Sequence, residues 1–290
     1  MFWPESIESW IGGKTLGIAS AHQKAQVIAP VLLSRLPIKE GVSISEIPTD
    51  ELGTFSGEIP RTLSPGEAAK AKARMGFESS DIPLQVSTEA SFYSHPQVMG
   101  LSIHEELVLL ADFNKERYYW GLIRSLETWG PQISLSDLTT AHDWLTAHHQ
   151  KGHHWMIIPS AETRHKFPPQ KALPSPEAVI QSLQALCLNG DPFQLVPDYR
   201  AHLHPGRMQI IEQATHQLVD TILSICPDCN QPGFAIQSKL SGLPCKYCGS
   251  PTQRAMYLVR KCSVCGIEAQ EVIPNQPAEA EPIDCEYCNP

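Results

Sequence analysis

The 290-residue chain has few basic residues and no long hydrophobic run. Its 22 Lys and Arg are outnumbered by 31 Asp and Glu, which gives a formal net charge of -9. Nucleic acids and anionic membranes attract basic surfaces, so the whole chain is expected to bind neither, although a local basic pocket is compatible with this charge. No apolar stretch approaches the roughly 20 residues that a membrane-spanning helix needs. These absences predict a soluble protein without a membrane partner.

An export signal is missing from the first ten residues. A signal peptide has a basic residue followed by an unbroken apolar run, whereas this segment contains Pro4, Glu5 and Glu8. We therefore expect a cytoplasmic protein, in which cysteines stay reduced.

Cysteine is plentiful, and it is concentrated in one region. Of the nine cysteines, eight follow residue 225 and form four Cys-x-x-Cys pairs. In chain order the pairs are Cys226/Cys229, Cys245/Cys248, Cys262/Cys265 and Cys285/Cys288. Two such pairs supply four thiolates, which is the ligand set of a tetrahedral structural zinc site. The spacing therefore predicts two structural zinc ions rather than disulfides.

The partition of the four pairs between the two ions is less clear from the sequence. Cys248 and Cys265 are each followed by a glycine, which eases the tight turn of a zinc knuckle, and residues 256–259 between them are strand-like. This pattern favours a nested arrangement, in which the second and third pairs share one ion and the first and fourth share the other. Sequential sharing, first with second and third with fourth, stays open.

The cysteine-rich region is acidic. From Asp228 onward it contains five Lys or Arg and seven Asp or Glu. Four thiolates around one divalent zinc ion add further negative charge. Because nucleic-acid binding requires positive charge to meet the phosphates, we expect this region to have a structural role or to contact a protein partner.

The rest of the chain alternates strand-like and helical patterns, which predicts an α/β domain with a mixed sheet and flanking helices over residues 1–205. A connecting amphipathic helix follows at 206–224, and a zinc-ribbon-like module occupies 225–290. Strands are expected at 15–20, 42–47, 84–88, 107–111, 118–123 and 155–158, and helices within 21–36 and at 64–75, 136–150 and 177–188. Residues 159–176 are expected to form a loop. The ninth cysteine, Cys187, is expected to serve packing.

Two polar segments are candidate anion-binding sites. Ser20, His22 and Lys24 lie between the first strand and the first long helix, where free amides and the helix dipole favour negative charge. Arg200 lies just before the connecting helix 206–224 and Arg207 lies at its start, and arginine suits bidentate recognition of phosphate or carboxylate. The plainer interpretation of the first segment is a polar turn with a solvated lysine.

Carboxylates that could act in catalysis occur in the first half of the chain. Glu89 follows the strand 84–88, and ligands of α/β proteins bind at the carboxyl ends of strands. Its alternative role is to cap the next turn. Glu67 closes a capping box with Ser64, and Lys70 lies one turn later on the same helix. The histidines at 148, 149, 153 and 154 are interpreted as a polar turn in preference to a metal site.

Several of these segments together resemble an uncharacterised bacterial family that is known only as a domain of unknown function. The resemblance is carried by residues 21–24, 50–56, 89–96, 200–208 and 285–290. The family usually has glycine where this chain has Gln23 and Ala90. Since no activity is established for the family, the resemblance supports an α/β body with a paired-cysteine zinc module more than it supports a function.

The α/β body is also similar, more weakly, to the house-cleaning nucleotide pyrophosphatases of the inosine triphosphate type. That resemblance implies that Ser20 and Lys24 hold phosphates, that Glu67 and Lys70 assist metal and phosphate, and that Glu89 holds magnesium or activates water. The pyrophosphatases usually have adjacent acidic residues where this chain has Thr88-Glu89-Ala90.

Two functions are compatible with the sequence. The first is a magnesium-dependent nucleotide (phosphoanhydride) hydrolase, or a nucleotide-binding enzyme, with structural zinc and a small-molecule nucleotide or phosphate ligand. The alternative is a non-catalytic interaction protein whose zinc ribbon contacts a protein partner. The first function requires six side chains to face one cleft, namely His22, Lys24, Lys70, Glu89, Arg200 and Arg207.

Overall fold

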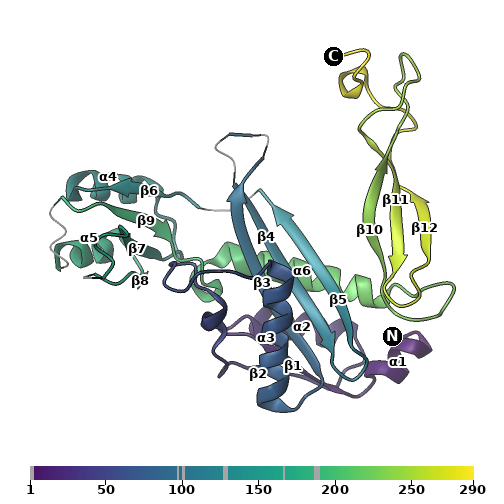
Figure 1. Cartoon of the computed structure of the whole chain (residues 1–290), viewed down its shortest axis with the longest axis horizontal. Helices are drawn as coiled ribbons and strands as arrows, with labels where there is room; N and C mark the ends of the chain where they lie inside the picture. The colour runs from purple at the N-terminus through teal and green to yellow at the C-terminus, as the bar shows by residue number, and fades with distance from the viewer. Residues whose placement is uncertain (1–2, 97, 100–101, 127–129, 166, 186–189) are drawn as a thin grey trace. The chain divides into compact units, whose positions relative to one another are not determined.

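The computed structural model describes residues 3–96, 98–99, 102–126, 130–165, 167–185 and 190–290 (Figure 1). The chain divides into two compact units. One comprises residues 13–219, and the other combines residues 1–12 with residues 220–290. The expected mixed α/β class, with sheets and flanking helices, is confirmed. None of the helices in the described ranges combines the length and the apolar character that a bilayer crossing requires.

A five-stranded mixed sheet forms the larger part of the first unit, which we call the α/β unit. Its strand order is β2-β1-β3-β4-β5, and the strands are β1 (Thr15–Ala19), β2 (Glu40–Ile44), β3 (Leu84–Ser94), β4 (Ser102–Asp112) and β5 (Arg117–Ser125). The strand β1 pairs in parallel with β2 and β3, whereas β3, β4 and β5 are antiparallel. The short link between β4 and β5 makes these two strands a hairpin.

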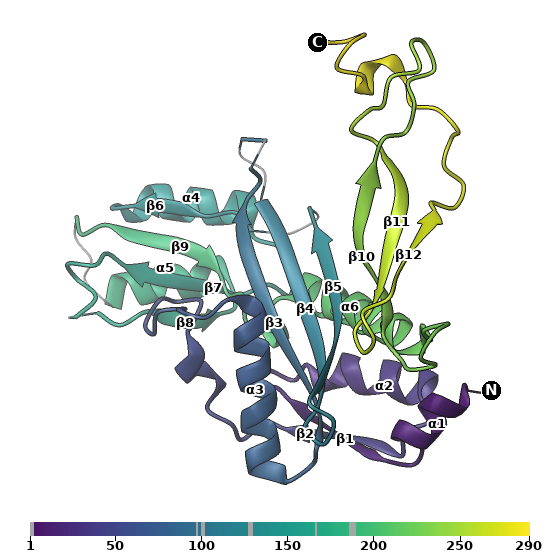
Figure 2. The same ribbon diagram turned by 45° about the vertical axis from the view of Figure 1, so that its right-hand side comes forward.

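Helices pack against this sheet. The helix α2 (Ala25–Arg35) contacts β1 and β2, and α3 (Pro65–Ser80) runs along β1, β3 and β4 (Figure 2). The capping box predicted at the start of α3 is present, because Ser64 and Glu67 bond to each other's backbone amides. The helix α3 does not end at Gly76 as the sequence suggested. It continues to Ser80 and ends at Asp81, which has the left-handed conformation.

A second, four-stranded sheet belongs to the same unit and has the order β6-β9-β7-β8. Its strands are β6 (Ile133–Leu135), β7 (Trp155–Pro159), β8 (Gln170–Leu173) and β9 (Phe193–Pro197), with helices α4 (Leu138–His148) and α5 (Pro176–Ala185) beside them. The prediction of a loop over 159–176 was wrong at β8, a short strand that pairs with β7. The prediction for Cys187 lies outside the described residues.

The helix α6 (Pro205–Leu223) follows a short 3-10 turn at Ala201–Leu203. Its backbone approaches β5 closely at Gly121, where a Cβ atom would lie 2.0 Å from the carbonyl oxygen of Ala214. Glycine is therefore required at this strand position for the helix to pack.

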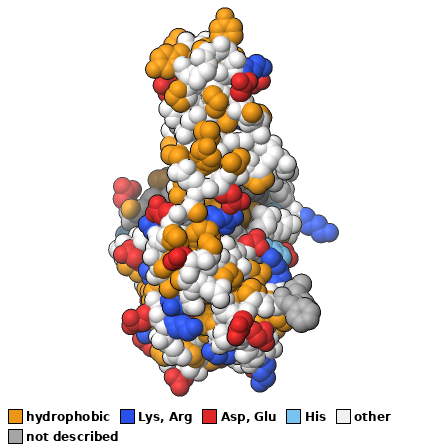
Figure 3. Space-filling view, turned by 90° about the vertical axis from the view of Figure 1, so that its right-hand side faces the viewer, with side chains coloured by type: hydrophobic (Ala, Val, Ile, Leu, Met, Phe, Trp, Pro, Cys, Tyr) orange, Lys and Arg blue, Asp and Glu red, His pale blue; other side chains and the backbone are white. Residues whose placement is uncertain are grey.

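The second unit, which we call the cysteine-rich unit, contains an antiparallel sheet of β10 (Phe234–Ser241), β11 (Ala255–Cys262) and β12 (Glu268–Val272). It also contains α1 (Glu5–Ile11) and a 3-10 turn at Pro282–Asp284. Exposed apolar side chains are scattered over its surface (Figure 3), and Tyr247, Ile283 and Tyr287 are at least 75% exposed.

Candidate functional site

A single pocket in the α/β unit collects most of the predicted ligand-binding residues. Its empty volume is about 720 Å³, solvent at its mouth included, which is within the range of small-molecule sites. The lining comes from the turn after β1, from residues 49–61, from α3, β3, β7 and β8, from the segment after β9 and from the first turn of α6. The lining residues used below are Ser20, His22, Lys24, Asp50, Phe55, Ser56, Arg61, Lys72, Thr88, Glu89, Lys171, Arg200 and Arg207.

The lining of the pocket is rich in basic side chains. It comprises Lys24, Arg61, Lys72, Lys171, Arg200 and Arg207 with the two carboxylates of Asp50 and Glu89, while the carboxylates that pair with Lys171, Arg200 and Arg207 are those of Glu58, Asp198 and Glu106 outside the lining. The chain as a whole has a formal charge of -9, so the basic residues are concentrated here against the overall trend. A concave surface lined in this way attracts an anionic ligand.

The turn between β1 and α2 forms one wall of the pocket. His22 and Gln23 both have positive φ, 66° and 59°, a left-handed conformation that glycine adopts at less cost. The side chain of His22 stacks on His202 with the ring centroids 5.1 Å apart. Burial, with further effects of Lys24 and His202, lowers the pKa of His22 to about 3, so its imidazole is neutral at neutral pH.

Lys24 is almost completely buried at the end of this turn. Its side chain crosses to β3, where Nζ donates a hydrogen bond of 2.7 Å to the hydroxyl of Thr88. Burial is the largest effect on the amine, and Arg207 and Lys72 add to it, so the pKa of Lys24 falls to about 7. Nearby carboxylates oppose the shift but do not cancel it.

Glu89 lies within β3 and not at its end, so the expectation of a carboxylate at a strand terminus was wrong. The parallel pairing of β3 with β1 ends at Ala19 and Ser87. The strand β3 then continues to Ser94, past the end of β1. Its carboxylate forms ion pairs with Arg61 and Lys72. Burial alone would raise the pKa of Glu89, but Lys72 and Arg61 outweigh burial, and the pKa is lowered.

Arg207 is held by a buried carboxylate that the sequence did not identify. The Nε of Arg207 donates to Oε1 of Glu106 at 2.6 Å, and Nε2 of His104 lies 2.9 Å from the same oxygen. Burial would raise the pKa of Glu106, yet Arg207 and the hydrogen bond from His104 lower it to about 2. The guanidinium of Arg207 also lies 5.3 Å from the ring centroid of Phe55.

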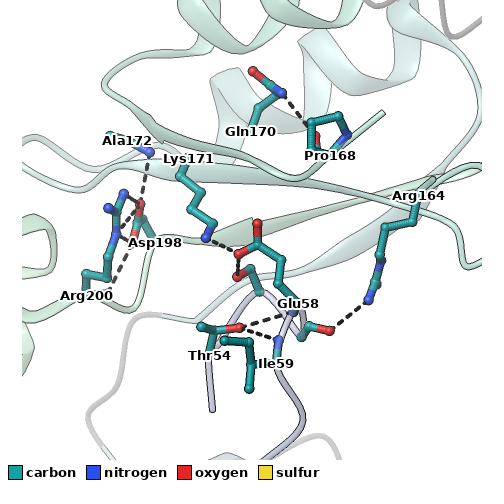
Figure 4. Close-up of polar contacts among 12 residues, drawn as sticks. Thr54, Glu58, Ile59, Arg164, Pro168, Gln170, Lys171, Ala172, Asp198 and Arg200 are labelled. Carbon is teal, nitrogen blue, oxygen red and sulfur yellow. Dashed lines mark hydrogen bonds and ion pairs between the residues drawn. The ribbon is translucent and has the colours of Figure 1, made fainter. Parts of the chain in front are cut away.

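Arg200 is oriented by Asp198, which is fully buried at the end of β9. The guanidinium donates through Nε and Nη2 to the two carboxylate oxygens, at 2.9 Å and 2.6 Å. The amide of Ala172 in β8 donates to the same carboxylate at 2.9 Å (Figure 4). Asp198 is therefore fixed from two strands, and it fixes Arg200 in turn.

The loop of residues 49–61 is fastened to the second sheet. Glu58 forms an ion pair with Lys171 of β8 and accepts a hydrogen bond of 2.7 Å from the hydroxyl of Ser56 (Figure 4). Arg164 donates to the carbonyl oxygen of Gly57 at 3.1 Å. These contacts hold the loop in place, so that Phe55 lines the pocket, and no local sequence pattern predicts them.

Not all predicted residues reach the pocket. Ser20, His22, Lys24, Glu89, Arg200 and Arg207 line it together. Glu67 is instead engaged in the capping box of α3, and Nζ of Lys70 lies 4.5 Å from the ring centroid of Tyr118. Lys72, two residues after Lys70, is the residue of α3 that enters the pocket.

The eight paired cysteines form two clusters, and neither predicted partition is correct. One cluster comprises Cys226, Cys229, Cys262 and Cys265, and the other comprises Cys245, Cys248, Cys285 and Cys288. The first pair thus joins the third, and the second joins the fourth. The strand register explains this, because β10 pairs Phe234 with Cys262 and so brings the knuckle before β10 to the knuckle after β11. In the second cluster, a β-bridge between Cys245 and Ala280 places the fourth Cys-x-x-Cys pair next to the second.

The sulfur positions in both clusters could each hold a metal ion. Cross-pair Sγ separations are 3.7 and 3.6 Å in the first cluster and 3.9 and 3.6 Å in the second. A tetrahedral zinc site with Zn–S bonds of about 2.3 Å has sulfur atoms about 3.8 Å apart, whereas a disulfide requires about 2.05 Å. Among the described residues, these are the groups of three or more potential ligands that come together, so the histidines at 148–154 form no such group.

The glycines that follow two of the Cys-x-x-Cys pairs led to the wrong partition, because asparagine can form the same turn. Gly249 and Gly266 have φ of 74° and 77° after their knuckles, as the sequence suggested. Asn230 follows the first knuckle and has φ of 54°, so asparagine provides the same turn there. The glycines therefore mark two knuckles without showing that these two share an ion.

Comparison with known proteins gives one match. The family model described as "Domain of unknown function (DUF6671)" matches residues 72–290, a range that includes Lys72, Glu89, Arg200, Arg207 and all eight clustered cysteines. No curated protein and no solved structure shows significant similarity to the chain. The weaker resemblance to nucleotide pyrophosphatases is thus not supported.

Proposed function

The chain belongs to the DUF6671 family, and we propose that its α/β unit binds the phosphate groups of a small molecule, with nucleotides as the first class to test. The observation that carries the proposal is the convergence of six basic side chains on one pocket in a chain of net charge -9, five of them oriented by carboxylates. Phosphate is the biological anion that best matches several convergent lysines and arginines.

The arginines are arranged so that donors remain for a ligand. Guanidinium carries five N–H donors, and Asp198 engages only Nε and Nη2 of Arg200. Because Asp198 already orients the guanidinium of Arg200, this side chain loses less conformational entropy on ligand binding than a free arginine would.

Magnesium fits Glu89 poorly. Carboxylate oxygens are the preferred protein ligands of Mg²⁺, but those of Glu89 are paired with Arg61 and Lys72. A divalent cation there would have to displace two positive side chains. We therefore assign Glu89 to orienting Arg61 and Lys72. Magnesium that enters bound to the ligand would be held by the phosphates, with Asp50 as the other carboxylate of the lining.

Hydrolysis of a phosphoanhydride bond is the second candidate. It is favoured by the grouping of Lys24, Lys72 and Arg61 around Thr88 and Glu89 of β3, because such a group can neutralise charge that develops on a leaving phosphate. The same samples test it, since release of phosphate or pyrophosphate is measured on each nucleotide that binds.

The two cysteine clusters are proposed to hold structural zinc. Four-cysteine sites leave no open position for water, so they stabilise a fold and do not activate a substrate. The alternative function, a protein partner at the ribbon, is supported by the exposed side chains of Tyr247, Ile283 and Tyr287 beside the second cluster.

Calorimetric titration at low salt tests the phosphate proposal directly. Phosphate, pyrophosphate and a panel of standard and deaminated nucleotides are titrated with and without magnesium, and released phosphate is assayed in parallel. Arg200→Met should weaken binding at least about tenfold, a loss of about 1.4 kcal/mol. Arg124→Met is the control, because Arg124 also pairs with a carboxylate, that of Glu105, but does not line the pocket. Equal affinity in both variants would contradict the proposal.

A further inference from the structure

One lysine in the pocket differs from all the other cations there. Arg61 and Lys72 pair with Glu89, while Lys171, Arg200 and Arg207 pair with Glu58, Asp198 and Glu106. In the described part of the chain, Lys24 alone among the six has no carboxylate within ion-pair distance. Its amine instead donates to a neutral hydroxyl, that of Thr88. Five cations of the pocket are thus paired with carboxylates, whereas Lys24 is hydrogen-bonded to a neutral group.

We propose that Lys24 is a carbonyl-reactive amine, and that the ligand of this pocket is a small phosphorylated aldehyde or ketone. The proposal rests on the proposed function, because the neighbouring cations are needed to hold the phosphate while Lys24 meets the carbonyl carbon. It adds to phosphate binding a covalent reaction at Nζ of Lys24.

The surroundings of Lys24 keep its amine reactive. Only the neutral amine attacks a carbonyl group, and an ordinary lysine is almost entirely protonated at neutral pH. Burial, Arg207 and Lys72 lower the pKa of Lys24 to about 7, although Glu106 and Glu89 oppose the shift. Half of the amine is therefore neutral near that pH. The bond to Thr88 uses one N–H and leaves the nitrogen lone pair available.

The reaction step conserves atoms and electrons without any redox partner. The lone pair of Nζ forms a bond to the carbonyl carbon, and the carbon–oxygen π electrons move to oxygen. One proton passes from nitrogen to that oxygen, which gives a carbinolamine. Loss of the hydroxyl group with the second nitrogen proton, as water, forms the carbon–nitrogen double bond of an imine. Charged N–H donors of Lys72 and Arg207, which face Lys24, are suited to stabilise the negative charge on oxygen during attack.

The electrostatics favour this role over simple phosphate binding at Lys24. An amine held for a phosphate gains by being charged, and burial beside Arg207 and Lys72 works against that charge. The other five cations pair with carboxylates and still have N–H donors for phosphate. Separate groups therefore serve the two ends of a phosphorylated carbonyl compound.

Trapping with borohydride tests the inference on the full-length, zinc-loaded protein. Borohydride reduces an imine to a stable secondary amine, so reaction with pyridoxal phosphate or glycolaldehyde phosphate should leave one adduct on the peptide that contains Lys24. Pyridoxal and glycolaldehyde, which lack the phosphate, should label that peptide about tenfold more slowly, the rate equivalent of about 1.4 kcal/mol. Peptide mapping by mass spectrometry on the wild-type protein needs no variant to fold.

Two variants and a competing anion test whether the label is specific to Lys24 in the pocket. Lys24→Met should abolish the adduct, whereas Lys115→Met should leave it unchanged, because burial also lowers the pKa of Lys115 but this lysine lies outside the pocket. Inorganic pyrophosphate should slow the labelling.

The outcomes separate the two proposals. If calorimetry shows phosphate binding but neither phosphorylated probe labels Lys24, the inference about the amine is overturned and the phosphate proposal stands. Labelling of Lys24 that is equally fast with and without the phosphate group would overturn the phosphorylated substrate class. If phosphates neither bind nor compete, the proposed function itself fails.

Discussion

The carboxylate of Glu106 in β4 lies 2.6 Å from Nε of Arg207 at the start of α6, although 101 residues separate them in the chain. Both side chains are no more than 1% exposed. This ion pair connects the five-stranded sheet to the segment that also supplies Arg200, so it fixes one wall of the pocket to another. A buried pair of this kind is costly to break, because either partner alone is an uncompensated charge.

Glu106→Gln should therefore lower the free energy of unfolding by about 3–5 kcal/mol, the usual cost of removing one partner from a buried ion pair. Denaturant unfolding followed by circular dichroism measures the loss. Glu105→Gln is the matched control on the same strand, since its partner Arg124 is 65% exposed and such pairs contribute about 1 kcal/mol or less. Similar losses for the two variants would show that Arg207 is not held as the structure indicates.

Gln23→Gly should stabilise the α/β unit by up to about 1 kcal/mol, because Gln23 has φ of 59° and a left-handed conformation strains residues with a side chain. Glycine removes the strain but adds backbone entropy to the unfolded chain, which limits the gain. Gln26→Gly, within the regular helix α2, is the control and should destabilise by about 1 kcal/mol. A loss of stability in both variants would refute strain at position 23.

The sequence predicted those parts of the fold and the site that local patterns determine. Periodicity located β1, β4, β5 and the long helices, and the capping box of α3 follows from Ser64 and Glu67 alone. Proximity of Lys24 and Glu89 could be anticipated because a strand-to-helix turn and a neighbouring parallel strand meet at one edge of a sheet. The length of β3 past Glu89 could not, since its last residues are set by pairing with β4.

The site residues that could not be predicted from the sequence are those whose roles depend on tertiary contacts. Glu106 ends a polar run, His104-Glu105-Glu106, that precedes the apolar residues of β4, and only its contacts with Arg207 and His104 make it a buried anion. The choice of Lys72 over Lys70 depends on which face of α3 meets the sheet. Asp198 acquires its role through Ala172 of β8, a strand too short and polar to be recognised.

The stability of the α/β unit should depend on pH through Lys24. The pKa of Lys24 is 10.5 in an ordinary setting and about 7 in the folded protein, where it faces Arg207 of α6, Lys72 of α3, Glu106 of β4 and Glu89 of β3, with His22 on its own turn. Between these two values the unfolded chain binds more protons, so the free energy of unfolding should rise with pH across this window. The slope is at most about 1.4 kcal/mol per pH unit.

Comparison with Lys24→Met isolates this contribution, because the variant lacks the titrating amine and keeps the other groups. The difference in unfolding free energy, wild type minus variant, should increase from pH 7 to pH 10. A flat difference would mean that Lys24 has an ordinary pKa. The lowered pKa values of Glu89 and Glu106 act in another range, since their stabilisation is lost only as the pH falls below about 4.5.

Zinc content after pairwise cysteine replacement should reveal the interleaved partition. Cys226→Ser with Cys262→Ser removes two ligands from one cluster, so the protein should keep about one tightly held zinc ion through a chelator challenge. Cys245→Ser with Cys262→Ser removes one ligand from each cluster and should weaken both. The nested partition predicts the reverse for these two variants, and the sequential partition predicts damage to both sites in each. Metal analysis by mass spectrometry after gel filtration distinguishes the three, because each partition assigns the same two substitutions to different ions.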